Sequence, residues 1–291
     1  MKRRVLLLAI VILLGLGTTA LAQDSRTADS TADWREDLEN LMTAIGRHPD
    51  PYRYAPQTGF DALAAALDAD IPVLPDAQIV VRMMEIVSLL QDGHSNFFPA
   101  IQRDFAFTLY PLVFYGFSDG VYLIDAAPEY ADLVGARLVR IDATPVEDVL
   151  ADLARLVPRD NDSGGRVLMP ANLATAEVLL GLGVIDDPAQ PRFLLDLPDG
   201  SQETINPAAI PSGEFLERFP RHFLLPVDES VLSRSRANQR LWSTPLNDGR
   251  VLYVQYNETQ SLGDALDRTG TRARCPGDRA ADSGYSLQSR G

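Results

Sequence analysis

The chain changes its hydrophobic period once, at the stretch Leu89–Phe98, and this change limits the folds open to it. Before this stretch, apolar residues recur at three- and four-residue intervals, which is the spacing of amphipathic helices. After it, short runs of aromatic and β-branched residues alternate with Pro, Gly and Asp, as in strands and turns. The sequence therefore predicts an α+β protein in which a helical N-terminal region precedes a β-rich part.

Three helices are predicted before the change of period. They cover Trp34–Ile45, Gly59–Ala69 and a segment that begins after Pro75–Asp76. The two prolines of the His48–Tyr52 segment forbid continuation of the first helix. The third helix is predicted to end at Gly93, because glycine favours the position after a helix C-cap.

Four strands and a helix are predicted next. The strands are Phe105–Tyr110, Leu112–Tyr115, Val121–Ile124 and Arg137–Ile141, and the helix is Pro145–Leu156. Proline is favoured in the first turn of a helix, where its missing N–H costs nothing. This order of elements predicts a small, partly open barrel.

The rest of the chain gives a less regular prediction. It consists of a loop at Asn161–Gly165, a helix at Leu173–Leu182, a hairpin of Phe193–Leu197 with Gln202–Ile205, mostly irregular structure over 206–248, and a strand at Gly249–Asn257 with no predicted strand partner. Residues 263–291 contain few large apolar residues, so this tail is predicted to be disordered.

The first 22 residues have the layout of a cleaved secretory signal peptide. A basic Lys2–Arg4 segment precedes the apolar run Val5–Leu16 and the small-residue site Ala20–Ala22. This predicts an exported protein, periplasmic or secreted. The apolar run is shorter than the roughly 20 residues that span a bilayer, so no stable membrane insertion is expected.

Charge and residue usage exclude several classes of function. The net charge of −14 argues against a nucleic-acid partner, since phosphate binding needs clustered Lys and Arg. Cys275 is the only cysteine, and His48, His94 and His222 lie far apart in the sequence. The sequence therefore predicts no disulfide framework, no metal site and no cofactor.

One motif suggests a hydrolase. Gly116–Gly120 matches the G-x-S-x-G pattern around Ser118, and Asp186 or Asp196 and then His222 follow in the order of a Ser-Asp-His triad. That motif needs a strand before the serine and a helix after it, whereas a strand is predicted to follow here. A hairpin turn at Ser118 explains the same residues, so an esterase built on Ser118 is the less favoured alternative.

His94 is the candidate general base. Imidazole titrates near neutral pH, and His94 follows a predicted helix end beside hydrogen-bonding groups. The alternative is a loop histidine that only hydrogen-bonds the backbone. Asp92 either caps the turn or orients the imidazole.

The stretch Leu90–Phe97 resembles the Asp-Gly-His-Ser/Thr segment of the tail-specific, or C-terminal-processing, serine peptidases, including their tricorn-like branch. Further similar segments follow in order: Tyr110–Phe114, Gly120–Ile124, Gly135–Asp142, Pro145–Val149 and Leu252–Asn257. The resemblance implies a helical region at 23–102, a PDZ-like module at 103–190, and a linker with the start of a Clp-protease/crotonase-like catalytic domain at 191–262. It also implies that His94 acts as the base for a serine nucleophile on peptide or unfolded protein substrates.

The chain departs from that family after Asn257. The Asp-Leu-Arg-x-Asn-x-Gly-Gly stretch and the serine-rich turn of the family do not occur, and an arginine-rich tail stands in their place. We interpret this tail as translated out of frame and the chain as truncated before its catalytic serine. A base without a nucleophile cannot carry out covalent acyl transfer, so the prediction is an inactive peptidase relative. The alternative is a PDZ-like module that binds peptides without cleaving them.

Overall fold

The structure, a computed structural model, describes residues 28–95, 97, 107–220, 222 and 224–257. They fall into two compact units, divided between Arg218 and Phe219. The predicted signal peptide (1–22), the start of the strand at Phe105 and the tail 263–291 lie outside the described residues. Within the described part, none of the helices combines the length and the apolar character needed to cross a membrane.

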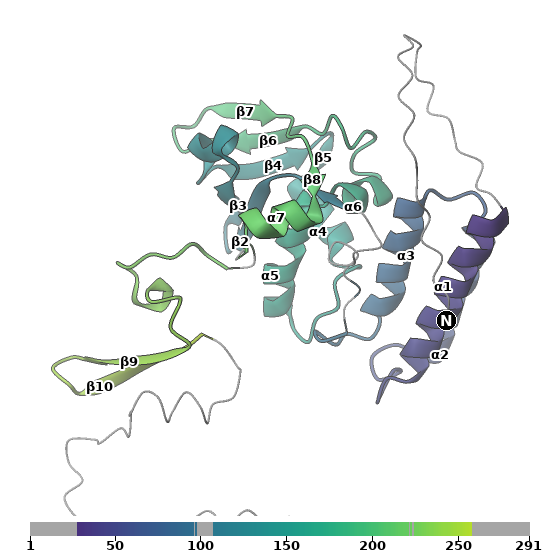
Figure 1. Cartoon of the computed structure of the whole chain (residues 1–291), viewed down its shortest axis with the longest axis horizontal. Coiled ribbons are helices and arrows are strands. Elements are labelled where there is room, and N and C mark those ends of the chain that lie inside the picture. Colours follow the sequence, from purple (N-terminus) through teal and green to yellow (C-terminus); the bar gives the residue numbers. More distant parts are fainter. Residues whose placement is uncertain (1–27, 96, 98–106, 221, 223, 258–291) are drawn as a thin grey trace, which may run out of the picture. The chain divides into compact units, whose positions relative to one another are not determined.

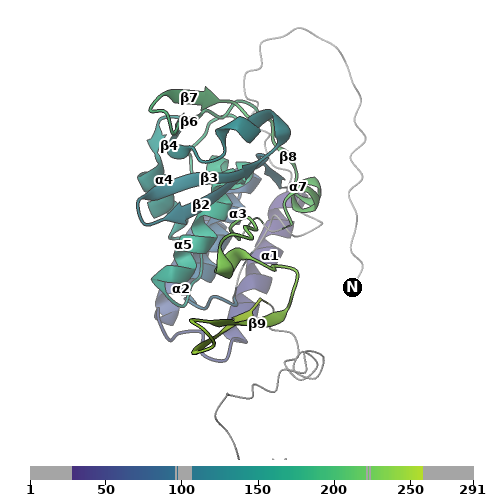
Figure 2. The ribbon, with the colours of Figure 1, turned by 90° about the vertical axis from the view of Figure 1, so that its left-hand side faces the viewer.

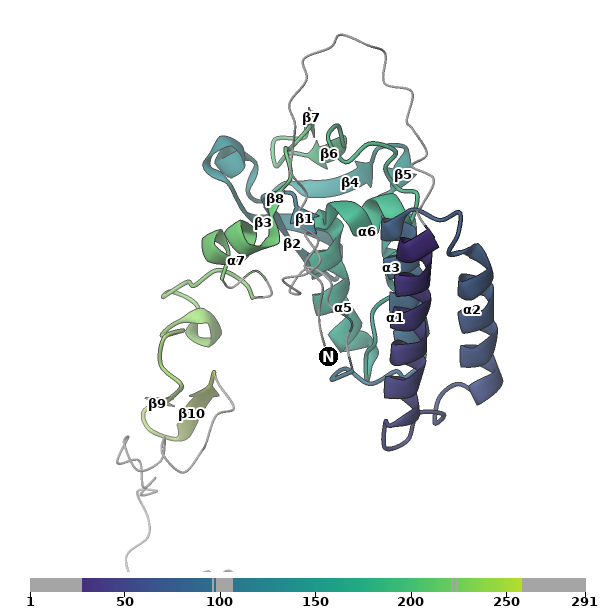
Figure 3. The ribbon, with the colours of Figure 1, turned by 45° about the vertical axis from the view of Figure 1, so that its right-hand side comes forward.

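The three predicted helices are confirmed and pack side by side (Figure 3). They are α1 (Ala28–Gly46), α2 (Gln57–Asp70) and α3 (Asp76–Ser88). The indole Nε1 of Trp34 on α1 donates to Asp76 Oδ1 at the start of α3, at 3.0 Å. α3 is apolar over most of its circumference because it packs against α1 and α2 and also against a later helix, α6 (Ala176–Gly181).

The predicted end of α3 at Gly93 is wrong. The helix ends at Ser88, and Gln91 is the residue that takes a left-handed backbone conformation, with φ of 46°. Leu90 is still buried after the helix has ended, which is why its spacing extended the apolar pattern in the sequence. The residues from Gln91 to Ser95 are therefore a separate turn and not the last turn of a helix.

The main sheet of the β-rich part is antiparallel (Figure 1). Its strands are β2 (Leu112–Phe117), β3 (Gly120–Ala126), β4 (Arg137–Ile141), β6 (Phe193–Asp196) and β7 (Gln202–Ile205), with the two-residue β5 (Thr144–Pro145) on β4. The order is β2-β3-β4-β6-β7, so β2 and β7 are its edges. The predicted hairpin of β6 and β7 belongs to this same sheet, which therefore continues past residue 190.

One face of the sheet holds the core of this layer. Phe114 of β2 and Phe193 of β6 stack with ring centroids 6.0 Å apart, and Tyr110 meets Phe193 edge to face at 5.3 Å. Helix α4 (Val146–Leu153) packs on β4 and β5 through buried apolar residues, as predicted from its spacing. The connection between β3 and β4 contains the short 3-10 helix η2 (Pro128–Leu133).

The predicted loop at Asn161–Gly165 is wrong, because helix α5 (Asp162–Ala171) begins there. The side chain of Asn161 caps this helix and accepts a hydrogen bond from Gly164 N at 3.0 Å. Capping and packing against β2, seen in Figure 2, offset the low helix propensity of the two glycines. The predicted helix at Leu173–Leu182 is present in two pieces, the 3-10 helix η3 (Asn172–Ala174) and then α6.

A short antiparallel strand pair joins two distant segments of the first unit. β1 (Thr108–Leu109) pairs with β8 (Ile210–Pro211), and α7 (Ser212–Arg218) follows β8. The carboxylate of Glu177 on α6 accepts hydrogen bonds from both the N–H and the hydroxyl of Thr108, each at 2.9 Å. These contacts connect β1 to α6, the helix that packs on α3.

The second unit contains a 3-10 turn η4 (Leu232–Arg234) and an antiparallel hairpin of β9 (Leu241–Leu246) and β10 (Val251–Tyr256). β10 was predicted, but β9 falls in the segment 206–248 that was predicted to be irregular. That segment also contains β8 and α7, so the prediction of a mostly irregular segment missed these three elements. β10 is paired along its whole length, from Val251 with Leu246 to Tyr256 with Leu241.

Candidate active site

The turn that carries His94 is built around the side chain of Asp92. Asp92 Oδ1 accepts a hydrogen bond from the backbone N–H of His94 at 3.0 Å, and the N–H of Ser95 donates to the Asp92 carbonyl at 3.0 Å. Aspartate commonly forms such local bonds, which compete with helix. The aspartate therefore shapes the turn directly after α3 has ended.

Asp92 also receives two side-chain donors. The Ser95 hydroxyl donates to Asp92 Oδ2 at 2.6 Å, and His48 Nε2 lies 3.2 Å from the same oxygen. The N–H of Asp50 donates to His48 Nδ1 at 3.2 Å, so Nδ1 acts as an acceptor and the proton of a neutral His48 ring sits on Nε2. His48 thus donates to Asp92, although the two residues are 44 positions apart.

These donors stabilise the ionised form of Asp92. The Ser95 hydroxyl, then the His94 N–H and then His48 lower the pKa of the Asp92 carboxyl from 3.8 to about 2. The carboxylate is therefore charged at any pH above about 3. The sequence indicated that Asp92 caps the turn or orients the imidazole, and the observed hydrogen bond to His94 N is the capping one.

A second carboxylate reaches this turn from a distant segment. Asp160, in the loop between α4 and α5, accepts a hydrogen bond from Gly93 N at 3.1 Å. A Cβ atom placed on Gly93 would lie 2.7 Å from Asp160 Oδ2. The close approach of Asp160 therefore favours glycine at position 93, which is not the helix terminator that the sequence suggested.

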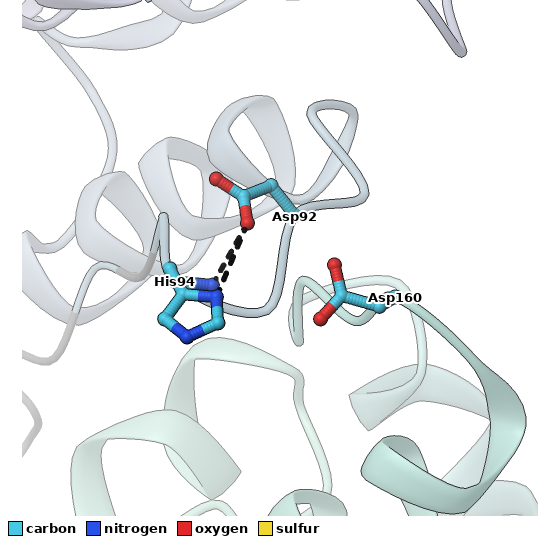
Figure 4. A group of neighbouring side chains, drawn as sticks. All are labelled: Asp92, His94 and Asp160. Atoms are coloured by element: carbon cyan, nitrogen blue, oxygen red, sulfur yellow. Dashed lines mark hydrogen bonds and ion pairs between the residues drawn. The ribbon is translucent and has the colours of Figure 1, made fainter. Parts of the chain in front are cut away.

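The imidazole of His94 is exposed beside the Asp92 carboxylate, and Asp160 approaches the same turn (Figure 4). Its side chain is 94% exposed, and Nδ1 lies 3.7 Å from Asp92 Oδ1, which is an ion-pair distance longer than a hydrogen bond. Within the described part of the chain, no hydroxyl or thiol is hydrogen-bonded to this ring. The nearby Ser95 hydroxyl is already used as a donor to Asp92.

Asp92, His94 and Asp160 are also groups of the kind that bind metal ions. One ligand atom from each lies within 4.8 Å of the others. Bonds of about 2.0–2.2 Å to one ion would place neighbouring ligand atoms about 3–3.5 Å apart, and the distance from His94 Nδ1 to Asp92 Oδ1 is 3.7 Å. The spacing of the histidines in the sequence did not indicate this grouping, because Asp160 comes from a separate segment.

Ser118 lies in a different environment. It occupies the two-residue turn between β2 and β3, whose flanking pair is Phe117 and Gly120, so the predicted hairpin turn is confirmed. A strand follows the serine where a nucleophile elbow requires a helix. Asp119 in the same turn accepts a hydrogen bond from the Tyr122 hydroxyl at 3.1 Å, which raises the pKa of that phenol.

The other members of the possible Ser118 triad have their own partners. Asp196 on β6 accepts a hydrogen bond from the Gln202 amide at 2.8 Å. His222 belongs to the second unit, where its Nδ1 lies 2.9 Å from the Phe219 carbonyl and burial lowers its pKa. Within the described residues of the first unit, Asp196 is not hydrogen-bonded to Ser118.

Comparison with known proteins gives a few distant structural neighbours. No protein-family model and no curated protein matches the chain. Solved structures of CPAF, a chlamydial serine protease, match with TM-scores of 0.43 for mature CPAF complexed with lactacystin, 0.42 for a CPAF mutant and 0.41 for mature CPAF. The identities are 18%, 18% and 17%, over 63%, 67% and 63% of this chain. The match spans 36%, 39% and 36% of those CPAF chains, well under half of their length.

Proposed function

We propose that the chain is an exported relative of the tail-specific serine peptidases that carries the general base His94 but does not hydrolyse peptide bonds by itself. The observation that carries this proposal is the state of His94. Its ring is exposed beside a charged Asp92, in a turn held by hydrogen bonds, and no hydroxyl or thiol among the described residues of the first unit is hydrogen-bonded to it. An imidazole in this state can take up a proton but has no hydroxyl to activate.

The finer parts of this proposal rest on the sequence resemblance. They are the tricorn-like branch, the PDZ-like module at 103–190, the start of a Clp-protease/crotonase-like domain before residue 262, and a periplasmic or secreted location. The antiparallel sheet from β2 to β7 with α4 across it is compatible with a PDZ-like module. Peptides and unfolded proteins are the proposed ligands.

A peptidase assay of the purified chain tests the proposal. With an unfolded polypeptide as substrate, we expect no more hydrolysis from the wild type than from His94→Ala. His222→Ala is the matched control, because it removes a histidine from the second unit. Hydrolysis by the wild type that is lost in His94→Ala but retained in His222→Ala would show that the chain is an active peptidase.

Peptide binding without cleavage is the second candidate function, and the edge strand β2 favours it. In the described part no other strand pairs with the outer edge of β2, and strand addition to such an edge is a common mode of peptide recognition. α5 packs against β2, but the hairpin end of the strand is more open, and Phe117 is 42% exposed. Phe117 contacts Tyr115 and Tyr122 with ring centroids 5.0 and 5.6 Å away, which forms an aromatic surface beside the edge.

A binding assay with fluorescently labelled extended peptides tests this candidate. We expect Phe117→Ala to weaken binding by about fivefold, since it removes aromatic contact area at the edge. Tyr54→Ala, which removes an aromatic side chain that is 53% exposed, is the matched control and should bind as the wild type does. Absence of binding even at millimolar peptide would count against a peptide-binding function.

A further inference from the structure

The hairpin of the second unit has an unusual edge strand. β10 contains six residues, Val251–Tyr256, none of which is charged. Four of its apolar residues are largely exposed: Val251 at 46%, Leu252 at 48%, Val254 at 56% and Tyr256 at 42%. In the described part, β9 is the only strand that pairs with it. An uncharged apolar edge of this length readily pairs with another strand.

The two faces of the hairpin differ in what covers them. One face contains Trp242, which is 5% exposed and packs against Tyr253 at 5.3 Å and under the guanidinium of Arg236 at 4.6 Å. The opposite face, here called the Val254 face, consists of the cross-strand pairs of Leu252 with Pro245, Val254 with Ser243 and Tyr256 with Leu241. Strands that are apolar on both faces are typical of larger sheets. β10 therefore has the residues of an inner strand but the position of an outer one.

The chain itself indicates which strand fits this edge. β9 is protected at its outer edge by Pro245, which pairs with Leu252 and has no N–H to donate. α5 packs against β2, whose first three residues are buried, and β7 has polar exposed residues that include Glu203. β1 and β8 have two residues each. Of the strand edges described, β10 is the one that combines six uncharged residues with four largely exposed apolar side chains, so a second β10 is the strand of this chain that matches it.

We propose that β10 is a self-association surface, on which the β10 strand of a second copy pairs in antiparallel orientation. The result is a four-stranded sheet in the order β9-β10-β10-β9, related by a twofold axis. The paired strands bring no like charges together, although each chain carries a net charge of −14. The antiparallel arrangement also places the loop with Asp248 beside the end of the second copy's hairpin, where Arg240 precedes β9.

Sedimentation velocity of the full chain tests the proposal. We expect the wild type to shift with concentration from a monomer of 31.9 kDa to twice that mass. Val254→Lys should raise the dimer dissociation constant by about tenfold or more, because a symmetric contact carries the substitution twice. Val73→Lys is the matched control, since Val73 is 71% exposed in the turn between α2 and α3. This control should dimerise as the wild type does.

Three results would overturn the proposal: a wild type that stays monomeric at all concentrations, a dimer unaffected by Val254→Lys, or a dimer weakened equally by Val73→Lys. Trp242 fluorescence shows whether Val254→Lys keeps the hairpin folded. If that variant does not fold, Leu252→Lys on the same face replaces it.

Disulfide trapping tests the strand orientation. In a Cys275→Ser background, Val254→Cys should form a covalent dimer under mild oxidation, because antiparallel pairing centred on Val254 brings the two copies of residue 254 together across the axis. Ser243→Cys, on the same face but on β9, should not. Equal trapping of both variants, or covalent species larger than a dimer, would contradict a closed twofold contact.

Discussion

The turn that carries His94 and the turn that carries Ser118 both place a group of catalytic type after a regular element, but their surroundings differ. The His94 turn is attached to two distant segments: His48 contacts Asp92, and Asp160 contacts Gly93. The Ser118 turn closes a hairpin, and its neighbour Asp119 bonds only Tyr122 on the adjoining strand. A group that belongs to a site is recognised by such convergence of distant residues, whereas a short motif alone does not distinguish the two.

Each of the two turns contains a glycine against which a distant side chain packs. Of the substitutions considered, Gly120→Ala should lower the free energy of unfolding most. Gly120 has φ of 156°, and a Cβ there would lie 2.6 Å from Arg137 Nε. Strain and overlap together should lower the free energy of unfolding by about 2–3 kcal/mol in urea denaturation followed by circular dichroism. Gly59→Ala in α2, where a Cβ meets nothing within 4 Å, is the control and should not destabilise. A Gly120→Ala protein as stable as the wild type would contradict this packing.

Asp92→Asn should have the next largest effect, about 1–2 kcal/mol of unfolding free energy. The amide keeps the shape of the side chain but loses the charge that accepts bonds from Ser95, His94 N and His48. Asp119→Asn in the other turn is the matched control and should change stability by less than about 0.5 kcal/mol. If both substitutions lowered the free energy of unfolding equally, the hydrogen bonds of Asp92 would not stabilise its turn more than those of Asp119 stabilise the other turn.

The contribution of Asp92 should depend on pH. Its pKa in the folded protein, about 2, lies below the ordinary value of 3.8, so its contribution is present above about pH 4 and is lost as pH falls through 2. It should amount to about 1 kcal/mol, less than the full shift implies, because solvent reaches the carboxylate. Unfolding free energies of the wild type and Asp92→Asn, measured from pH 6 to pH 2.5, should therefore converge as the pH falls. A difference that is constant with pH would show that Asp92 acts only through its shape.

Gly93→Ala should cost about 0.5–1 kcal/mol, less than Gly120→Ala, because the overlapping atom is the mobile end of the Asp160 side chain. Combining Gly93→Ala with Asp160→Ala should recover part of the loss, since the smaller side chain leaves room for the new methyl group. Additive losses in this double-mutant cycle would mean that Asp160 does not define the space at Gly93.

Ser118→Ala should have the smallest effect, within about 0.5 kcal/mol of the wild type, as expected for a turn residue outside any network. A serine-directed covalent probe should not label Ser118. Labelling that disappears in Ser118→Ala would revive the esterase alternative and make the second turn the functional one.

The regular elements were largely predictable because each depends on local spacing. The helices α1 and α2, the strands β2, β3 and β4 and the hairpin of β6 and β7 occur where the apolar periods place them. The errors fall where a local signal competes with packing. Gly164 and Gly165 suggested a loop, but the Asn161 cap and the contact with β2 stabilise the helix α5 there. β9 was not predicted, because Pro245 interrupts the strand pattern in the sequence.

The candidate site shows the same limit. His94 was recognisable from the residues around it, and Asp92 from its position before the turn. His48 and Asp160 were not, since nothing in the sequence relates residues 44 and 68 positions away from Asp92. Only the packing of α3 and the position of the α4–α5 loop bring them together.

The sequence by itself determined the α+β class, most helices and strands, and the presence of a turn with a candidate base at His94. These follow from the spacing of apolar residues and from turn chemistry, which act over a few residues. The tertiary structure decided which carboxylates meet that base, why position 93 is glycine, and which strand edges are covered. Those outcomes depend on the approach of segments far apart in the chain, where close packing leaves room for one arrangement of side chains and not another.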